Sequence, residues 1–132
     1  MPDTVYNELK NNEKTFAIFA NYEELFEIRS VNKECLEKMS ARCPYFHKGE
    51  IGVICLAFEE KKSKNKHICI LDEKRARNFC ERNQIRIAGL IGLLIWQKNN
   101  GDLDRYECAS IHKNLYISRF YIKRSILDEL IE

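Results

Sequence analysis

Apolar residues in the first half of the chain recur mostly at intervals of three and four, the spacing that places side chains on one helix face. It predicts a helix over residues 5–9 capped by Asp3-Thr4, a second over 13–26, and a third from the cap Asn32 through Met39. Cys43-Pro44 ends the third helix, because proline disfavours helical geometry in the preceding residue. A fourth helix is predicted from Lys48-Gly49 to the lysine-rich loop at 61–66, with its buried face at Ile51, Ile54, Cys55 and Phe58.

Shorter apolar runs predict strands. Residues 27–31 alternate strictly between polar and apolar positions, the pattern of a short strand. Strands at 67–71 and 85–88 alternate with helices at 73–82 and 89–98, and the continuous apolar residues of the last segment predict burial on several sides. Beyond Gly101 the pattern predicts a helix around 105–113 and a terminal helix from about Ser118. The alternation indicates an α/β fold in which helices cover a mainly parallel sheet.

Length and composition are those of one folded domain. The 132 residues are 45% hydrophobic with five glycines and two prolines, which argues against disorder and predicts a single domain over residues 1–132. The net charge of +2 is small, so any affinity for nucleic acid must come from local clusters of charge. The first residues carry neither a basic segment nor an apolar run, and no stretch reaches the length of a membrane span. We therefore expect a cytoplasmic protein with no membrane partner.

The six cysteines show no Cys-x-x-Cys pair and no short histidine spacing, so the sequence argues against a zinc site. Cys55, Cys69 and Cys80 lie inside apolar patterns, where a free thiol behaves as a small buried hydrophobe. We expect them in the core and reduced.

Two carboxylates occupy positions where chemistry is often found. Asp72 follows the predicted strand 67–71, and the carboxyl ends of parallel strands form the crevice in which open α/β sheets bind ligands. Glu50 stands at the start of a predicted helix. Mg²⁺ and Mn²⁺ prefer such hard oxygen ligands. The structural alternatives are a helix cap for Asp72 and a charge that complements the helix dipole for Glu50.

Basic side chains follow Asp72 directly, at Lys74, Arg75 and Arg77. They are candidates for binding a phosphate backbone, although a charged helix face is more often simply solvated. No Gly-rich phosphate loop and no nucleophile elbow occurs, and the three histidines are scattered, so a serine or cysteine triad has little support.

Four motifs, taken in order, resemble the PIN-like family of small prokaryotic nucleases, and most closely its VapC-type toxin branch. They are Thr4-Val-Tyr-Asn-Glu8-Leu, Gly49-Glu50-x-x-x-Ile54-x-Leu-Ala57, Ile70-Leu-Asp72-Glu-x-x-Ala76-Arg77 and Ile87-Ala-Gly89-Leu-Ile-Gly92-Leu-Leu. The resemblance covers almost the whole chain, and the block from Gly49 to Gly101 is its most specific part.

The resemblance implies a three-layer α/β/α, Rossmann-like domain in which Glu8, Glu50 and Asp72 bind Mg²⁺ or Mn²⁺ and hydrolyse RNA. Metal-activated water would attack the phosphodiester while Lys74, Arg75 and Arg77 hold the RNA backbone. It further implies that the protein is the toxin of a toxin–antitoxin pair, that an antitoxin protein is its partner, and that it forms a homodimer.

The chain departs from the family pattern at its start. Family members begin with a strand that ends in an Asp, followed by a helix, and reach the Val-Tyr-x-Glu segment only afterwards. We therefore expect an N-terminally truncated domain that lacks about 25 residues, one metal ligand and a central strand. A misassigned start, a degenerate gene and a strand supplied by a partner chain all remain open. The alternative function is a catalytically inactive remnant or a binding and dimerisation module.

Overall fold

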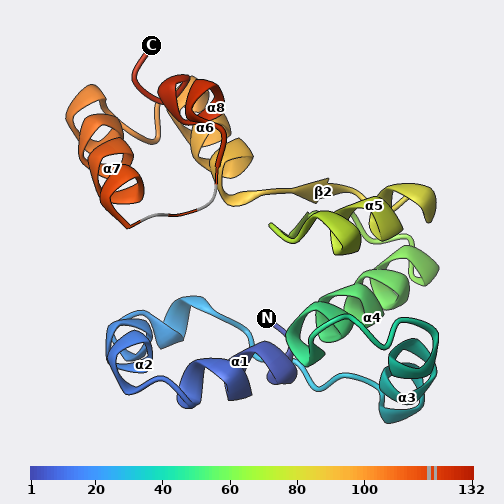
Figure 1. The fold of residues 1–132 in the computed structure, drawn as a ribbon. Coiled ribbons are helices and arrows are strands. Elements are labelled where there is room, and N and C mark those ends of the chain that lie inside the picture. The colour runs from blue at the N-terminus through green and yellow to red at the C-terminus, as the bar shows by residue number, and fades with distance from the viewer. Residues whose placement is uncertain (119, 121) are drawn as a thin grey trace. The chain divides into compact units, whose positions relative to one another are not determined.

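The computed structural model describes residues 1–118, 120 and 122–132, and it is mostly helical with one small parallel sheet (Figure 1). Two compact units divide the chain, Met1–Ile87 and Ala88–Glu132. The elements of the first unit are α1 (Asp3–Lys10), α2 (Glu13–Ala20), the 3-10 helix η1 (Glu23–Leu25), α3 (Lys33–Arg42), α4 (Lys48–Lys62), β1 (Cys69–Ile70) and α5 (Lys74–Arg82). β2 (Ile87–Ala88) spans the boundary, and the second unit continues with α6 (Leu90–Asn100), α7 (Arg105–Ile117) and α8 (Arg124–Asp128). The single domain stays a prediction.

Local signals placed both ends of α3 correctly, but not the start of α1 or the end of α2. Asn32 caps α3, since its side-chain oxygen accepts a hydrogen bond from the Cys35 backbone N–H at 3.0 Å, and α3 ends immediately before Cys43-Pro44. The predicted cap Asp3-Thr4 is wrong, because α1 already begins at Asp3 after Pro2. α2 ends at Ala20, six residues earlier than predicted, with Asn21 as its C-cap. Capping depends on residues within one helical turn, so a single sequence can reveal a cap.

α4 forms the centre of the first unit. α1 and α3 both pack against it (Figure 1). Of its predicted buried face, Ile51, Ile54 and Cys55 are buried, the last two at 0% exposure, while Phe58 is half-buried at the edge of the same core. A helix buried this far receives most of its stability from its packing and little from intrinsic propensity.

Two glycines let α1 approach α4 closely. A Cβ atom placed on Gly52 would lie 1.9 Å from Thr4 Oγ1, and one placed on Gly49 would lie 2.6 Å from Glu8 Oε2. Thr4 and Glu8 are one turn apart on α1, and the two glycines are one turn apart on α4. Gly49 and Gly52 therefore form the face of α4 that contacts α1, a role that the sequence alone did not reveal.

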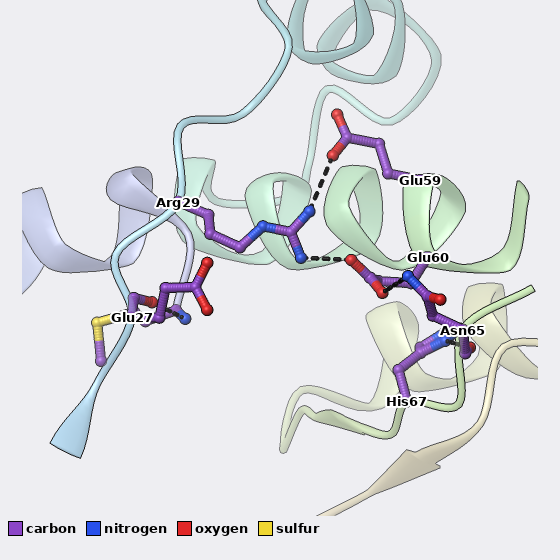
Figure 2. A network of polar contacts seen from close by, with 7 residues as sticks. Glu27, Arg29, Glu59, Glu60, Asn65 and His67 are labelled. Carbon is purple, nitrogen blue, oxygen red and sulfur yellow. Dashed lines mark hydrogen bonds and ion pairs between the residues drawn. The ribbon is translucent and has the colours of Figure 1, made fainter. Parts of the chain in front are cut away.

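A polar network joins the segment before α3 to the last turns of α4 (Figure 2). The Arg29 guanidinium donates to a carboxylate oxygen of Glu60 and lies 3.5 Å from one of Glu59. Asn65 Nδ2 donates to the second oxygen of Glu60 at 2.8 Å. The hydrogen bond from Arg29 is the main reason that the pKa of the Glu60 carboxyl lies below its ordinary value.

The predicted strand at 27–31 is wrong. Arg29 forms an isolated parallel bridge with Pro2, in which Arg29 N–H donates to Met1 O and Asp3 N–H donates to Arg29 O, both at 2.9 Å. Because α1 begins at Asp3, the ladder cannot continue beyond Pro2 in that direction.

The sheet is smaller than predicted. β1 and β2 pair in parallel, with Cys69 N–H donating to Arg86 O at 2.9 Å, but each strand has two residues in place of the predicted 67–71 and 85–88. The fold is compatible with the α/β class, and its three-layer arrangement stays a prediction.

The second unit buries Ile91, Cys108, Leu127 and Leu130. Within α6 burial is seen at Ile91 alone, and Trp96 is 59% exposed, so the expected burial on several sides is not observed. The terminal helix begins at Arg124, not near Ser118, because Ser118 ends α7 and its hydroxyl donates to Leu115 O at 2.9 Å. Positions 119 and 121 of that prediction lie outside the described residues.

Candidate active site

Glu8 extends from α1 to the first turn of α4. Its Oε1 accepts a hydrogen bond from the Gly49 backbone N–H at 2.9 Å, across a sequence separation of 41 residues. The first N–H groups of a helix have no partner within the helix, and they carry the positive end of its dipole. A carboxylate there is stabilised by both effects. The contact depends on the absence of a side chain at Gly49.

Glu50 lies in the same helical turn. Its Oε2 accepts a hydrogen bond from the His47 backbone N–H at 3.0 Å, so Glu50 closes the turn back onto the N-cap residue. Two of the three predicted carboxylates are therefore brought together at the N-terminal end of α4. Each carboxylate also has a structural role there, which is the alternative that we raised for Glu50 from the sequence.

A pocket of about 650 Å³ lies beside this helix end. Residues of α1, of α3 and of the start of α4 line it, among them Glu8, His47 and Lys48. This volume is in the range of small-molecule and substrate pockets. His47 and Lys48 were not selected from the sequence as site residues. Their position immediately before Gly49-Glu50 is the signal that would have identified them.

Asp72 lies in the connection between β1 and α5, and its side chain is exposed. It is not the cap of α5, because Glu73 has that role and accepts a hydrogen bond from the Ala76 N–H at 2.8 Å. The predicted helix start at Glu73 is therefore one residue early. β1, which leads to Asp72, packs against α4.

The carboxylates are the right chemical class of ligand for a hard divalent cation. Mg²⁺ commonly binds through one or two carboxylates and keeps several waters, and Glu8 with Glu50 provides two at one helix end. Across residues 1–118, 120 and 122–132, no group of three or more His, Cys, Asp or Glu side chains is placed to hold a metal ion. Glu8 and Glu50 thus have the donor chemistry that a divalent cation prefers, and their sharing of one cation, with Asp72 as a third ligand, stays a prediction.

Comparison with protein families decides the classification. A family model described as a PIN domain matches residues 1–132. The chain belongs to the PIN-domain family. Searches of curated proteins and of solved structures found no match. Membership suggests a nuclease-like function, PIN domains generally use divalent metal ions, and PIN nucleases bind RNA.

The three predicted RNA-binding residues of this PIN domain lie at the start of α5. Lys74 and Arg75 are exposed, and the Arg75 guanidinium lies over the ring of Tyr45, 5.6 Å from its centre. Arg77 is half-buried, and its Nε is a buried donor without a hydrogen-bond partner among the described residues. Lys74 and Arg75 are therefore accessible to a phosphate, and Arg77 is less so.

The buried thiols of the PIN domain behave as core residues. Burial raises the pKa of Cys69 and of Cys80 to about 11, so both stay protonated at neutral pH. A protonated thiol is a poor metal ligand. The expectation that Cys55, Cys69 and Cys80 lie in the core is confirmed.

No helix in the described part of the chain is both long and apolar enough to span a membrane.

Proposed function

We propose that this PIN domain is a divalent-metal-dependent ribonuclease, with Glu8, Glu50 and Asp72 as its acidic residues. The observation that carries the proposal is the hydrogen bond from Gly49 N–H to Glu8, which brings two of these carboxylates to one helix end beside a pocket. Membership of a family of metal-using nucleases supports the assignment.

The chain's own residues would contribute position and charge. Glu8 and Glu50 would hold Mg²⁺ or Mn²⁺, and Asp72, from the connection between β1 and α5, would be the third acidic ligand. The bound cation supplies a more acidic water and neutralises charge on the phosphate oxygens. Lys74 and Arg75 would hold the RNA backbone through its phosphates, and the half-buried Arg77 would add to the positive charge there.

The proposal also covers the protein's cellular location, its protein partner and its oligomeric state. A VapC-type toxin would work in the cytoplasm, pair with an antitoxin protein and form a homodimer. These three expectations follow from the resemblance of the four motifs to that branch. An antitoxin, for example, should suppress the RNA cleavage proposed for the purified protein.

The direct test is cleavage of a mixed single-stranded RNA by the purified chain in Mn²⁺, repeated with EDTA and with Asp72→Asn. We expect both changes to abolish cleavage. Glu37→Gln is the matched control, because it removes one charge from an exposed position on α3 outside the proposed acidic group, and it should leave the rate unchanged. Full cleavage by Asp72→Asn would contradict the proposed role of Asp72.

A second function is favoured by a specific observation. One oxygen of Glu8 accepts a hydrogen bond from the Gly49 N–H of α4, and one oxygen of Glu50 accepts from the N–H of the N-cap residue His47. The described residues contain no three-ligand metal group. A PIN domain whose acids are purely structural would be an RNA-binding or dimerisation module without hydrolysis. A folded sample that binds RNA in a filter assay but never cleaves it in Mn²⁺ would decide for this alternative.

A further inference from the structure

Two cysteines on neighbouring helices lie within bonding reach of each other. The Sγ atoms of Cys35, on α3, and Cys55, on α4, are 2.6 Å apart. A disulfide bond is about 2.05 Å long, so the two atoms are about half an ångström from covalent contact. α3 and α4 pack against each other, so the pair is held together by the core and not by a mobile loop.

The two thiols differ in access. Cys35 is half-buried near the start of α3, whereas Cys55 is completely buried in the middle of α4. The other four cysteines, at 43, 69, 80 and 108, are all buried. A small oxidant that reaches the protein therefore meets Cys35 before the other five.

We propose that Cys35 and Cys55 form a reversible disulfide when the protein meets hydrogen peroxide, and that this pair is a redox modification site. In the first step the Cys35 thiolate attacks one peroxide oxygen, the O–O bond breaks, and Cys35 becomes a sulfenic acid with release of hydroxide. In the second step Cys55 loses its proton and attacks Cys35 Sγ, which displaces the hydroxyl group as hydroxide. Two thiols and one peroxide thus give one disulfide and two waters, and two electrons pass from sulfur to oxygen.

The second step is the slow one. Burial is the main reason that the pKa of Cys55 is raised, and the neighbouring Cys35 thiol adds to the shift. The thiolate of Cys55 is therefore scarce at neutral pH, and closure of the disulfide depends on the short distance to Cys35. A sulfenic acid on Cys35 should accumulate first and then disappear.

The cross-link would tie α3 to the helix that carries Gly49 and Glu50. It closes a loop with a sequence separation of 20 residues, which restricts the unfolded chain. We expect the midpoint of thermal unfolding to rise by about 10 °C on oxidation and to return with dithiothreitol.

The experiment uses the full chain, reduced, freed of reductant and treated with a small excess of hydrogen peroxide. Intact mass should fall by about 2 Da, for the two hydrogens lost. Trypsin places the six cysteines in six separate peptides, so a digest without reductant identifies the pair directly. We expect residues 34–38 linked to residues 49–61, and no linked peptide in Cys35→Ser. Cys108→Ser, which removes a buried thiol of the second unit, is the matched control and should keep the link.

Three results would overturn the inference. They are a folded wild-type protein whose mass is unchanged after peroxide, a digest that links any other two cysteine peptides, and a covalent dimer on a non-reducing gel in place of the internal link. The wild-type digest is decisive by itself, so the test holds even where a variant fails to fold.

Discussion

Replacing Gly52 by alanine tests the closest approach between α1 and α4. The new Cβ would lie 1.9 Å from Thr4 Oγ1, 3.1 Å from Thr4 Cβ and 3.2 Å from Pro2 Cβ. Turning the Thr4 side chain moves Oγ1 but leaves both Cβ atoms in place. The two helices must therefore move apart by a few tenths of an ångström, which would also draw Glu8 away from the start of α4.

The size of the effect follows from two opposing terms. Alanine in place of glycine inside a helix gains up to about 1 kcal/mol from helix propensity. Overpacking of a well-packed contact costs typically about 1–3 kcal/mol. Because the clash involves two Cβ atoms as well as the hydroxyl, we expect the second term to dominate, with a net loss of about 1–2 kcal/mol in the free energy of unfolding.

Urea denaturation followed by circular dichroism measures this loss. Gly92→Ala is the matched control, because Gly92 is also inside a helix but its Cβ position has no described atom within 4 Å. We expect Gly92→Ala to stabilise by up to about 1 kcal/mol. If Gly52→Ala proved as stable as the wild type while Gly92→Ala behaved as expected, the close packing of Thr4 on Gly52 would be refuted.

Two further predictions concern single polar contacts. Glu8→Ala should lower the free energy of unfolding by about 1 kcal/mol and Glu8→Gln by less, because the amide oxygen can still accept the bond from Gly49; equal stability of Glu8→Ala and wild type in urea denaturation would show that this bond contributes nothing. The second prediction rests on the lowered pKa of Glu60: its contribution is present above the ordinary value of 4.5 and is lost as the pH falls below it. Arg29→Met should therefore flatten the fall in unfolding temperature between neutral and acidic pH, and an unchanged pH profile would argue against the Arg29–Glu60 pair.

Local chemistry made part of the fold predictable. The Asn32 cap and the apolar face of α4 depend on residues three or four apart, and the stop at Cys43-Pro44 depends on two adjacent residues, so a single sequence displays all three. The strand at 27–31 failed for the opposite reason. Alternation shows that a segment suits a strand, but a strand exists only where another extended segment can pair with it.

The candidate site was also predictable only in part from the sequence. Motif positions indicated Glu8, Glu50 and Asp72, and the first-turn position of Glu50 followed from the sequence alone. The tertiary structure decided that Glu8 meets the same helix end, since the hydrogen bond to Gly49 joins residues 41 apart and needs a glycine at the point of contact.

The sequence by itself determined most of the helical segments, the burial of Cys55, Cys69 and Cys80, and the family to which the motifs point. Only the tertiary structure decided that Cys35 faces Cys55 and that His47 shares a pocket with Glu8. The physical reason is the distance along the chain over which each effect acts. Propensity and capping act over one helical turn, whereas these contacts depend on how α1, α3 and α4 pack, which no local pattern encodes.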